Sequence, residues 1–276
     1  MRKFNTAGFF VHAILIIVVL VSVFPIIWML AIAINPVTES VAGWNAIYTT
    51  KPTLQNFASI FNLMPVMRNM YNSLFTTVLG VVTTLFFCSL AGFAFAKFYF
   101  PGKKVLFYFI IFTMLIPLEV GIIPLFVIMR NLDLINSLWA LIIPKAATAV
   151  GIFYMRQYIL GVPTEVLEAA KIDGCSDFKM YYRIVLPIIK PGLASWAVLT
   201  AIARWNDFFW PLIFLRAKEQ FTLIVAISLL PVSEGLSTPW PVIMAGTSMA
   251  VIPIIILYFI FQRFQVAGMA EGAVKG

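Results

Sequence analysis

The sequence predicts an all-α integral membrane protein. Of its 276 residues, 62% are hydrophobic and 11% are charged, whereas soluble proteins carry roughly 25% charged residues. A soluble domain of this size could not bury so much apolar surface, and several apolar stretches are long enough to cross a bilayer. Because backbone polar groups in lipid must bond within the protein, we expect these stretches to be helical.

Six stretches have the length that a membrane crossing requires. The first, residues 9–34, is longer than the apolar core of a cleavable signal peptide, so we expect a retained helix. The others are residues 71–96, 105–129, 138–160, 192–215 and 242–262. The apolar run Phe221–Leu230 is too short to cross and is followed by a proline cluster. We interpret it as a surface or re-entrant helix.

The distribution of Lys and Arg predicts which loops face the cytoplasm. With the N-terminus inside, twelve basic residues lie on the cytoplasmic side and five outside, and Lys145 and Arg204 lie within spans. Both termini and the loop 161–190, between spans four and five, are then cytoplasmic. The net charge is +8, but the basic residues form no single patch, which argues against nucleic acid as a partner. We expect one transmembrane domain over residues 1–276.

Local signals predict two short helices within the loop 161–190. Thr164 can cap a helix start, and Glu165 favours the positive end of the helix dipole. Gly174 is a typical helix stop, because glycine accepts the left-handed conformation. Ser176 can cap a second short helix that runs toward the fifth span.

The same loop contains a gapped motif that begins at Glu168 and ends at Pro187: E-A-A, three residues, G, nine residues, I-x-L-P. It resembles the signature of permease subunits of binding-protein-dependent ABC importers, in particular the carbohydrate-uptake (maltose-type) family. The resemblance implies a cytoplasmic coupling helix that docks into a cleft on a separate ATPase subunit. The docking residues it implies are Glu168, Ala169, Ala170, Gly174, Ile184, Leu186 and Pro187. Without the motif, a basic loop lying on anionic lipid headgroups would be the preferred interpretation.

Two further segments resemble carbohydrate-importing permeases. Trp205-Asn206-Asp207 followed by Trp210-Pro211 is similar to their fifth span. The C-terminal tail, residues 264–276, has a similar ending, which implies a contact with the ATPase dimer; a frayed terminus is the alternative. The tail residues implied in that contact are Gly272, Ala273, Val274, Lys275 and Gly276.

Ionisable residues inside the expected spans should face a bundle interior or a water-filled cavity. Arg204 and Asp207 are three residues apart and can meet on one helix face, either as a neutralising pair or in transport. Glu119 lies between Pro117 and Pro124, a spacing that predicts a broken helix. Such a break is typical of a translocation pathway, but neighbouring helices can also satisfy a simple kink. The substrate-pathway candidates are Glu119, Trp205, Asn206 and Asp207.

The resemblance implies a permease subunit of an ATP-driven importer, which forms half of the pathway for a sugar or oligosaccharide. The implied partners are a second, homologous permease in a heterodimer, two ATPase subunits and an extracytoplasmic solute-binding protein. The chain has no Walker-type G-x-x-x-x-G-K-[ST], so we expect no enzyme activity and no cofactor of its own, with ATP and Mg²⁺ bound by the ATPases. The expected location is the bacterial or archaeal inner membrane.

Two other function classes fit the sequence less well. Glu119 and Asp207 could serve as proton or sodium sites in a secondary carrier driven by an ion gradient. An intramembrane enzyme is disfavoured, because the chain has one histidine, His12, and two cysteines in different surroundings, Cys88 and Cys175. These residues offer no metal or catalytic constellation.

Overall fold

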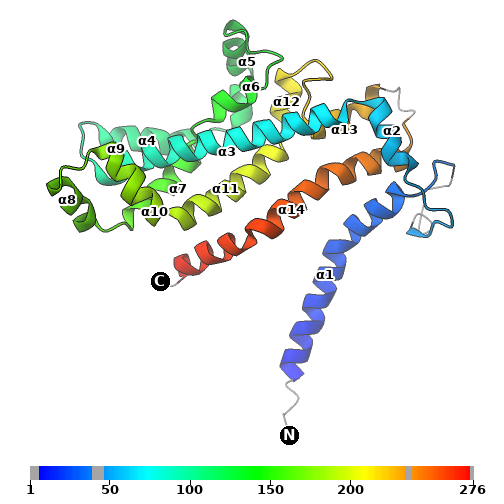
Figure 1. The fold of residues 1–276 in the computed structure, drawn as a ribbon, viewed down its shortest axis with the longest axis horizontal. Helices are drawn as coiled ribbons and strands as arrows, with labels where there is room; N and C mark the ends of the chain where they lie inside the picture. Colours follow the sequence, from blue (N-terminus) through cyan, green and yellow to red (C-terminus); the bar gives the residue numbers. More distant parts are fainter. Residues whose placement is uncertain (1–5, 39–46, 234–237, 274–276) are drawn as a thin grey trace. The chain divides into compact units, whose positions relative to one another are not determined.

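The structure is a computed structural model, and it describes residues 6–38, 47–233 and 238–273 (Figure 1). All regular secondary structure in these ranges is helical. The chain divides into two compact units. The first comprises residues 1–66 and 226–252, and the second residues 67–225 and 253–276. The all-helical expectation is confirmed.

The first unit is built around the end of α1 (Thr6–Ala33). The buried Asn56, in α2 (Gln55–Leu63), donates hydrogen bonds to the carbonyls of Ala33 and Asn35 at 2.8 and 2.7 Å. These carbonyls lie where α1 has run out of helical partners, so the amide closes its C-terminal end. The unit also contains most of α13 (Leu223–Ser233) and the first part of α14 (Trp240–Ala273).

The second unit contains one uninterrupted long helix, α3 (Val66–Lys97), and a series of shorter ones (Figure 1). The segment after α3 forms α4 (Lys103–Thr113), a 3-10 turn η2 (Leu118–Gly121) and α5 (Ile122–Asn131). Next come α6 (Trp139–Ile142), the 3-10 turn η3 (Ile143–Lys145) and α7 (Ala149–Leu160). The loop 161–190, called the coupling loop from here on, and two further helices then follow as α8 (Thr164–Ile172), α9 (Asp177–Met180), the π-turn η4 (Tyr181–Val185), α10 (Leu186–Ile188), α11 (Lys190–Trp205) and α12 (Phe209–Phe214). The second part of α14 also belongs to this unit.

Three described helices are long and apolar enough to cross a membrane. They are Phe10–Ala33, Val66–Lys97 and Trp240–Ile260, which correspond to expected spans one, two and six. A fourth candidate is the pair Asp177–Ile188 and Lys190–Trp205, which meet at 81°. The short run after Phe221 is helical, as predicted, in α13.

Expected spans three, four and five differ from continuous helices. Span three breaks around Pro117, as its Pro and Gly spacing predicts. Span four breaks at Pro144, whose ring nitrogen carries no hydrogen to donate. In span five, α11 ends at Trp205, and the Asp207 carboxylate then accepts from the Trp210 backbone N–H at 3.3 Å, near the start of α12. A side chain that bonds nearby backbone in this way competes with continuation of the helix.

Close contact between α3 and α7 anchors the side of the second unit that holds the coupling loop. At Gly92, an added Cβ would lie 2.8 Å from the Met155 Cβ and 2.9 Å from the Arg156 backbone nitrogen. Around it, a buried cluster joins the two helices to the coupling loop: Cys88, Phe93, Met155, Ile159, Val162, Leu167, Ala170, Met180, Tyr181, Val185 and Ile189. The absence of a side chain at residue 92 therefore sets the spacing of these helices.

We predict that Gly92→Ala destabilises the protein by about 1–3 kcal/mol, because overpacking forces the two backbones apart. The measurement is the thermal unfolding midpoint of the purified protein. Gly121→Ala is the matched control, since nothing lies within 4 Å of a Cβ at that position. Equal midpoints for the two variants would contradict the close packing of α3 on α7.

Candidate functional site

The first half of the coupling loop has the helix ends that its local sequence signals predict, with one exception. Helix α8 has Glu165 in its first turn and ends before Gly174, which has a φ of 75°. The Ser176 hydroxyl accepts from the Lys179 backbone N–H at 3.4 Å and so caps α9, as expected. The exception is Thr164: the cap position falls on Pro163, and the Thr164 hydroxyl instead accepts from the Lys97 ammonium at 3.4 Å.

The motif residues of α8 separate into an inner and an outer face. Ala170 is buried together with Leu167, whereas Glu168 and Ala169 are exposed. Gly174 is also exposed, and no atom lies within 4 Å of a Cβ built on it. Farther along, Pro187 is exposed, while Ile184 and Leu186 are half-buried against the core. The loop thus offers a surface of small residues beside a fixed inner face.

An exposed apolar side chain lies at the end of that outer face. Ile172, in the last turn of α8, is 87% exposed, and Phe178 and Tyr182 in the following turns are 61% and 66% exposed. Aromatic residues of this kind are enriched at protein interfaces. The outer face of the loop therefore exposes apolar and aromatic side chains that the rest of the described loop does not cover.

Tyr181 fixes the second half of the loop to α3. Its ring is 1% exposed and stacks on Phe93 with ring centroids 5.8 Å apart. Its hydroxyl forms a hydrogen bond with the Ser89 hydroxyl at 2.7 Å. A buried tyrosine normally needs such a polar partner, and here the partner belongs to the long helix.

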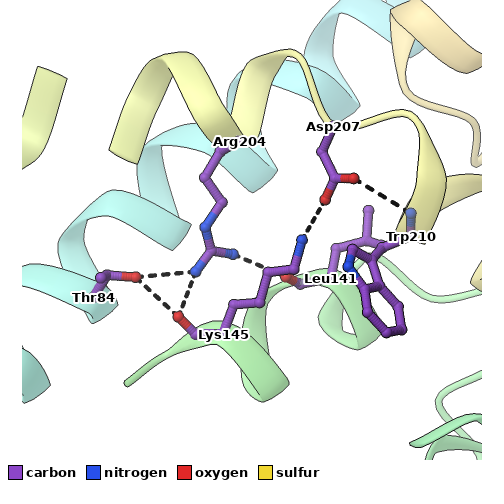
Figure 2. Close-up of polar contacts among 6 residues, drawn as sticks. All are labelled: Thr84, Leu141, Lys145, Arg204, Asp207 and Trp210. Carbon is purple, nitrogen blue, oxygen red and sulfur yellow. Dashed lines mark hydrogen bonds and ion pairs between the residues drawn. The ribbon is translucent and has the colours of Figure 1, made fainter. Parts of the chain in front are cut away.

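A second polar site lies where expected spans four and five break (Figure 2). The Lys145 ammonium forms an ion pair with Asp207 Oδ2 at 2.5 Å, and it lies 5.6 Å from the centre of the Trp210 ring. The side chains of Lys145 and Asp207 are 27% and 15% exposed. The other carboxylate oxygen of Asp207, Oδ1, accepts a hydrogen bond from the backbone N–H of Trp210.

Arg204 bonds to backbone in the same site and not to the carboxylate (Figure 2). Its guanidinium donates to the carbonyls of Leu141 and Lys145 at 2.9 and 2.6 Å. It also donates to the hydroxyl of Thr84 at 3.0 Å, which itself donates to the Lys145 carbonyl. The guanidinium packs so closely on α3 that an added Cβ at Gly80 would lie 2.9 Å from it.

Of the two alternatives for Arg204 and Asp207, the neutralising pair on one helix face is therefore not formed. Because α11 ends at Trp205, Asp207 lies beyond the helix and not one turn along its face. Its partner is Lys145, which sequence reasoning left without a role. The available signal was the charge balance, since Lys145 and Arg204 are basic residues that lie away from the ends of expected spans four and five, and the carboxylate of Asp207 needed one of them.

The remaining pathway candidates do not gather in this site. Glu119 is exposed in η2, and Asn206 is exposed after the end of α11. The Trp205 side chain is 5% exposed.

In the tail, Gly272 and Ala273 end α14, whereas Val274, Lys275 and Gly276 lie outside the described residues. Within the described parts of the chain, no group of three or more His, Cys, Asp or Glu could hold a metal ion.

Comparison with known proteins identifies the family. The family described as binding-protein-dependent transport system inner membrane component matches residues 88–271, a segment that contains both the coupling loop and the half-buried charges of Lys145, Arg204 and Asp207. The chain belongs to this family. It is thus an inner-membrane permease component of an ABC importer, and the ion-gradient-driven carrier is not favoured.

Whole-chain relatives agree with this assignment. The arabinooligosaccharides transport system permease protein AraQ of Halalkalibacterium halodurans is 35% identical over 93% of this chain and 92% of its own length. The lactose transport system permease protein LacG of Rhizobium radiobacter is 31% identical over 96% and 95%. A crystal structure of a bacterial ABC transporter that imports the acidic polysaccharide alginate contains a chain with a TM-score of 0.82 and 28% identity, covering 95% of this chain and 98% of that one.

We predict that Lys145→Met lowers stability by about 1–3 kcal/mol, because it removes the cation that is hydrogen-bonded to the partly buried Asp207 carboxylate. Adding Asp207→Asn should recover part of the loss, since the uncompensated charge is then removed. The measurement is a double-mutant cycle on the thermal stability of the purified protein. Additive effects of the two substitutions would contradict the ion pair.

Proposed function

We propose that this chain is the permease subunit of an importer for a sugar or oligosaccharide, driven through docking of α8 on a separate ATPase. The printed names of its relatives support the solute class: arabinooligosaccharides and lactose for two permeases, and alginate for the structural neighbour. Another relative, 32% identical over 78% of this chain, is named for sn-glycerol-3-phosphate. Polyhydroxylated solutes are the shared chemistry of this set.

The observation that carries the docking role is the outer face of α8. It combines Glu168 and Ala169 of the E-A-A motif with the 87% exposed Ile172, on a helix whose inner face is buried through Leu167 and Ala170. Small residues allow a partner backbone to approach, and an exposed branched side chain supplies apolar area for it to cover. We assign the ATPase contact to Glu168, Ala169, Ala170, Gly174, Ile184, Leu186 and Pro187, with Gly272, Ala273, Val274, Lys275 and Gly276 as a second contact.

The proposed complex has a second, homologous permease in a heterodimer, two ATPases that bind ATP and Mg²⁺, and an extracytoplasmic solute-binding protein. This subunit is non-catalytic and binds no cofactor. Residues 1–276 form a single transmembrane domain with six spans and both termini in the cytoplasm. That orientation follows from the twelve-to-five excess of basic residues on one side, and it brings α8 to the compartment that holds ATP.

Nucleotide binding supplies the free energy in this scheme. ATP draws the two ATPases together and their clefts shift, so α8 moves with its cleft and biases the spans between two conformations. A ligand can shift such an equilibrium only by binding one state better than the other. Of the four pathway candidates, Glu119 and Asn206 are exposed and best placed to meet solute, whereas Trp205 is buried and Asp207 is paired with Lys145.

Reconstitution separates this function from an ion-driven carrier. The complex in proteoliposomes, with loaded binding protein, should accumulate labelled oligosaccharide when ATP is supplied on the ATPase side. Uptake should be insensitive to proton and sodium ionophores. Accumulation driven by an ion gradient without the ATPase subunits would refute the proposal.

We predict that Gly174→Arg leaves membrane insertion intact and abolishes recovery of the ATPase with the permease, because it adds bulk and charge to the docking face. The measurement is co-purification of the ATPase with tagged permease. Gly102→Arg is a closely matched control: Gly102 also has a positive φ, 77° against 75°, and also has open space around its Cβ. Both variants carry a similar backbone strain of about 1–2 kcal/mol, so equal ATPase recovery from the two would argue against docking at α8.

A further inference from the structure

Lys97, the last residue of α3, reaches across to the start of the coupling helix. Its ammonium donates to the Val162 carbonyl at 2.5 Å, the Leu160 carbonyl at 3.5 Å and the Thr164 hydroxyl at 3.4 Å. A lysine ammonium has three donors, and each is directed at the same short stretch of chain. Hydrogen bonds from a charged donor are roughly twice as strong as neutral ones.

The stretch that Lys97 holds is the link between α7 and α8. Helix α7 ends at Leu160 and α8 begins at Thr164, so residues 161–163 are all that joins them. Val162 in the middle of the link is 3% exposed, and Pro163 fixes its own backbone φ. Because the carbonyl of Val162 also accepts a hydrogen bond from Lys97, the link does not let α8 rotate freely relative to α7.

The other end of α8 is also attached to the end of α3. The Lys171 ammonium lies 5.5 Å from the centre of the Phe98 ring. Phe98 meets Phe93 edge-on at 5.0 Å, and Phe93 stacks on Tyr181 of the second half of the loop. The coupling helix is therefore held against one helix terminus near its first and its last turn.

α3 carries polar attachments along the rest of its length. Near its middle, Thr84 joins the site formed by Arg204 and the Lys145 carbonyl. At its start, the amides of Asn69 and Asn72 donate to carbonyls of Lys218, Glu219 and Phe221. Figure 1 shows α3 as one unbroken helix with α8 and α9 at one end. Because the helix is continuous, a displacement of its end beside α8 moves the residues that make these other contacts as well.

We propose that Lys97 is a positioning residue for energy coupling, which transmits displacement of α8 to α3. This inference rests on the proposed docking of α8 on the ATPase. The ammonium need not touch ATPase or solute; it makes the link 161–163 follow α3. Without it, α8 can tilt with the ATPase cleft while α3 stays in place, so ATP is hydrolysed with less transport.

The test uses the complete complex in proteoliposomes with Lys97→Met, which preserves side-chain length and removes every donor. We expect wild-type recovery of the ATPase and retained ATP hydrolysis, with sugar imported per ATP reduced about five- to tenfold, at the lower end of the range for coupling between sites. Lys97→Arg should restore most of the ratio because donors return. Lys104→Met, an exposed lysine two residues after Gly102, is the matched control and should leave the ratio unchanged.

A second readout is amide hydrogen exchange across α8 in the assembled complex, which should quicken in Lys97→Met and stay unchanged in Lys104→Met. Thr164→Val removes one acceptor at an exposed position and should shift the transport ratio in the same direction, by about twofold. An unchanged ratio in Lys97→Met, or a loss of ATPase recovery in that variant, overturns the role of Lys97. Failure of the wild-type permease to recover any ATPase would instead refute the docking of α8.

Discussion

Backbone carbonyls left free where a helix breaks inside the protein must find another donor, and Arg204 supplies it here. The guanidinium satisfies Leu141 and Lys145 beside the interruption at Pro144, and Thr84 on α3 completes the arrangement. Broken helices at membrane depth are tolerated only where such partners exist. Because the ion pair between Lys145 and Asp207 lies in the same place, the two interrupted segments and the long helix meet at one polar site.

This constraint explains the contrast between α3 and its neighbours. α3 contains no proline and runs unbroken for 32 residues, so its backbone needs no outside donors in its interior. Its polar side chains are then free to bond elsewhere, as Thr84, Ser89 and Lys97 do. The interrupted helices have irregular backbone geometry. Side chains of the continuous helix α3 contact them and hold them in place.

Local sequence signals predicted local structure well. The stop at Gly174 and the cap at Ser176 depend on residues within a few positions of each other, and both are confirmed. The break around Pro117 is of the same kind. The partners of charged residues are harder to predict from the sequence, because the contact between Lys145 and Asp207 depends on where α11 ends. Helical spacing favoured Arg204 as the partner, whereas the end of α11 at Trp205 removed Asp207 from that face.

The tight fit of the Arg204 guanidinium against Gly80 ties together two distant positions of the chain. A larger residue on α3 at that point would collide with the guanidinium, and a shorter one in place of the arginine would leave a void and remove the side-chain donor to the Leu141 carbonyl. A substitution at either position therefore requires a compensating substitution at the other. Across homologous sequences, substitutions at 80 and 204 should therefore occur as correlated pairs, a statistical trace of this contact that an alignment would reveal.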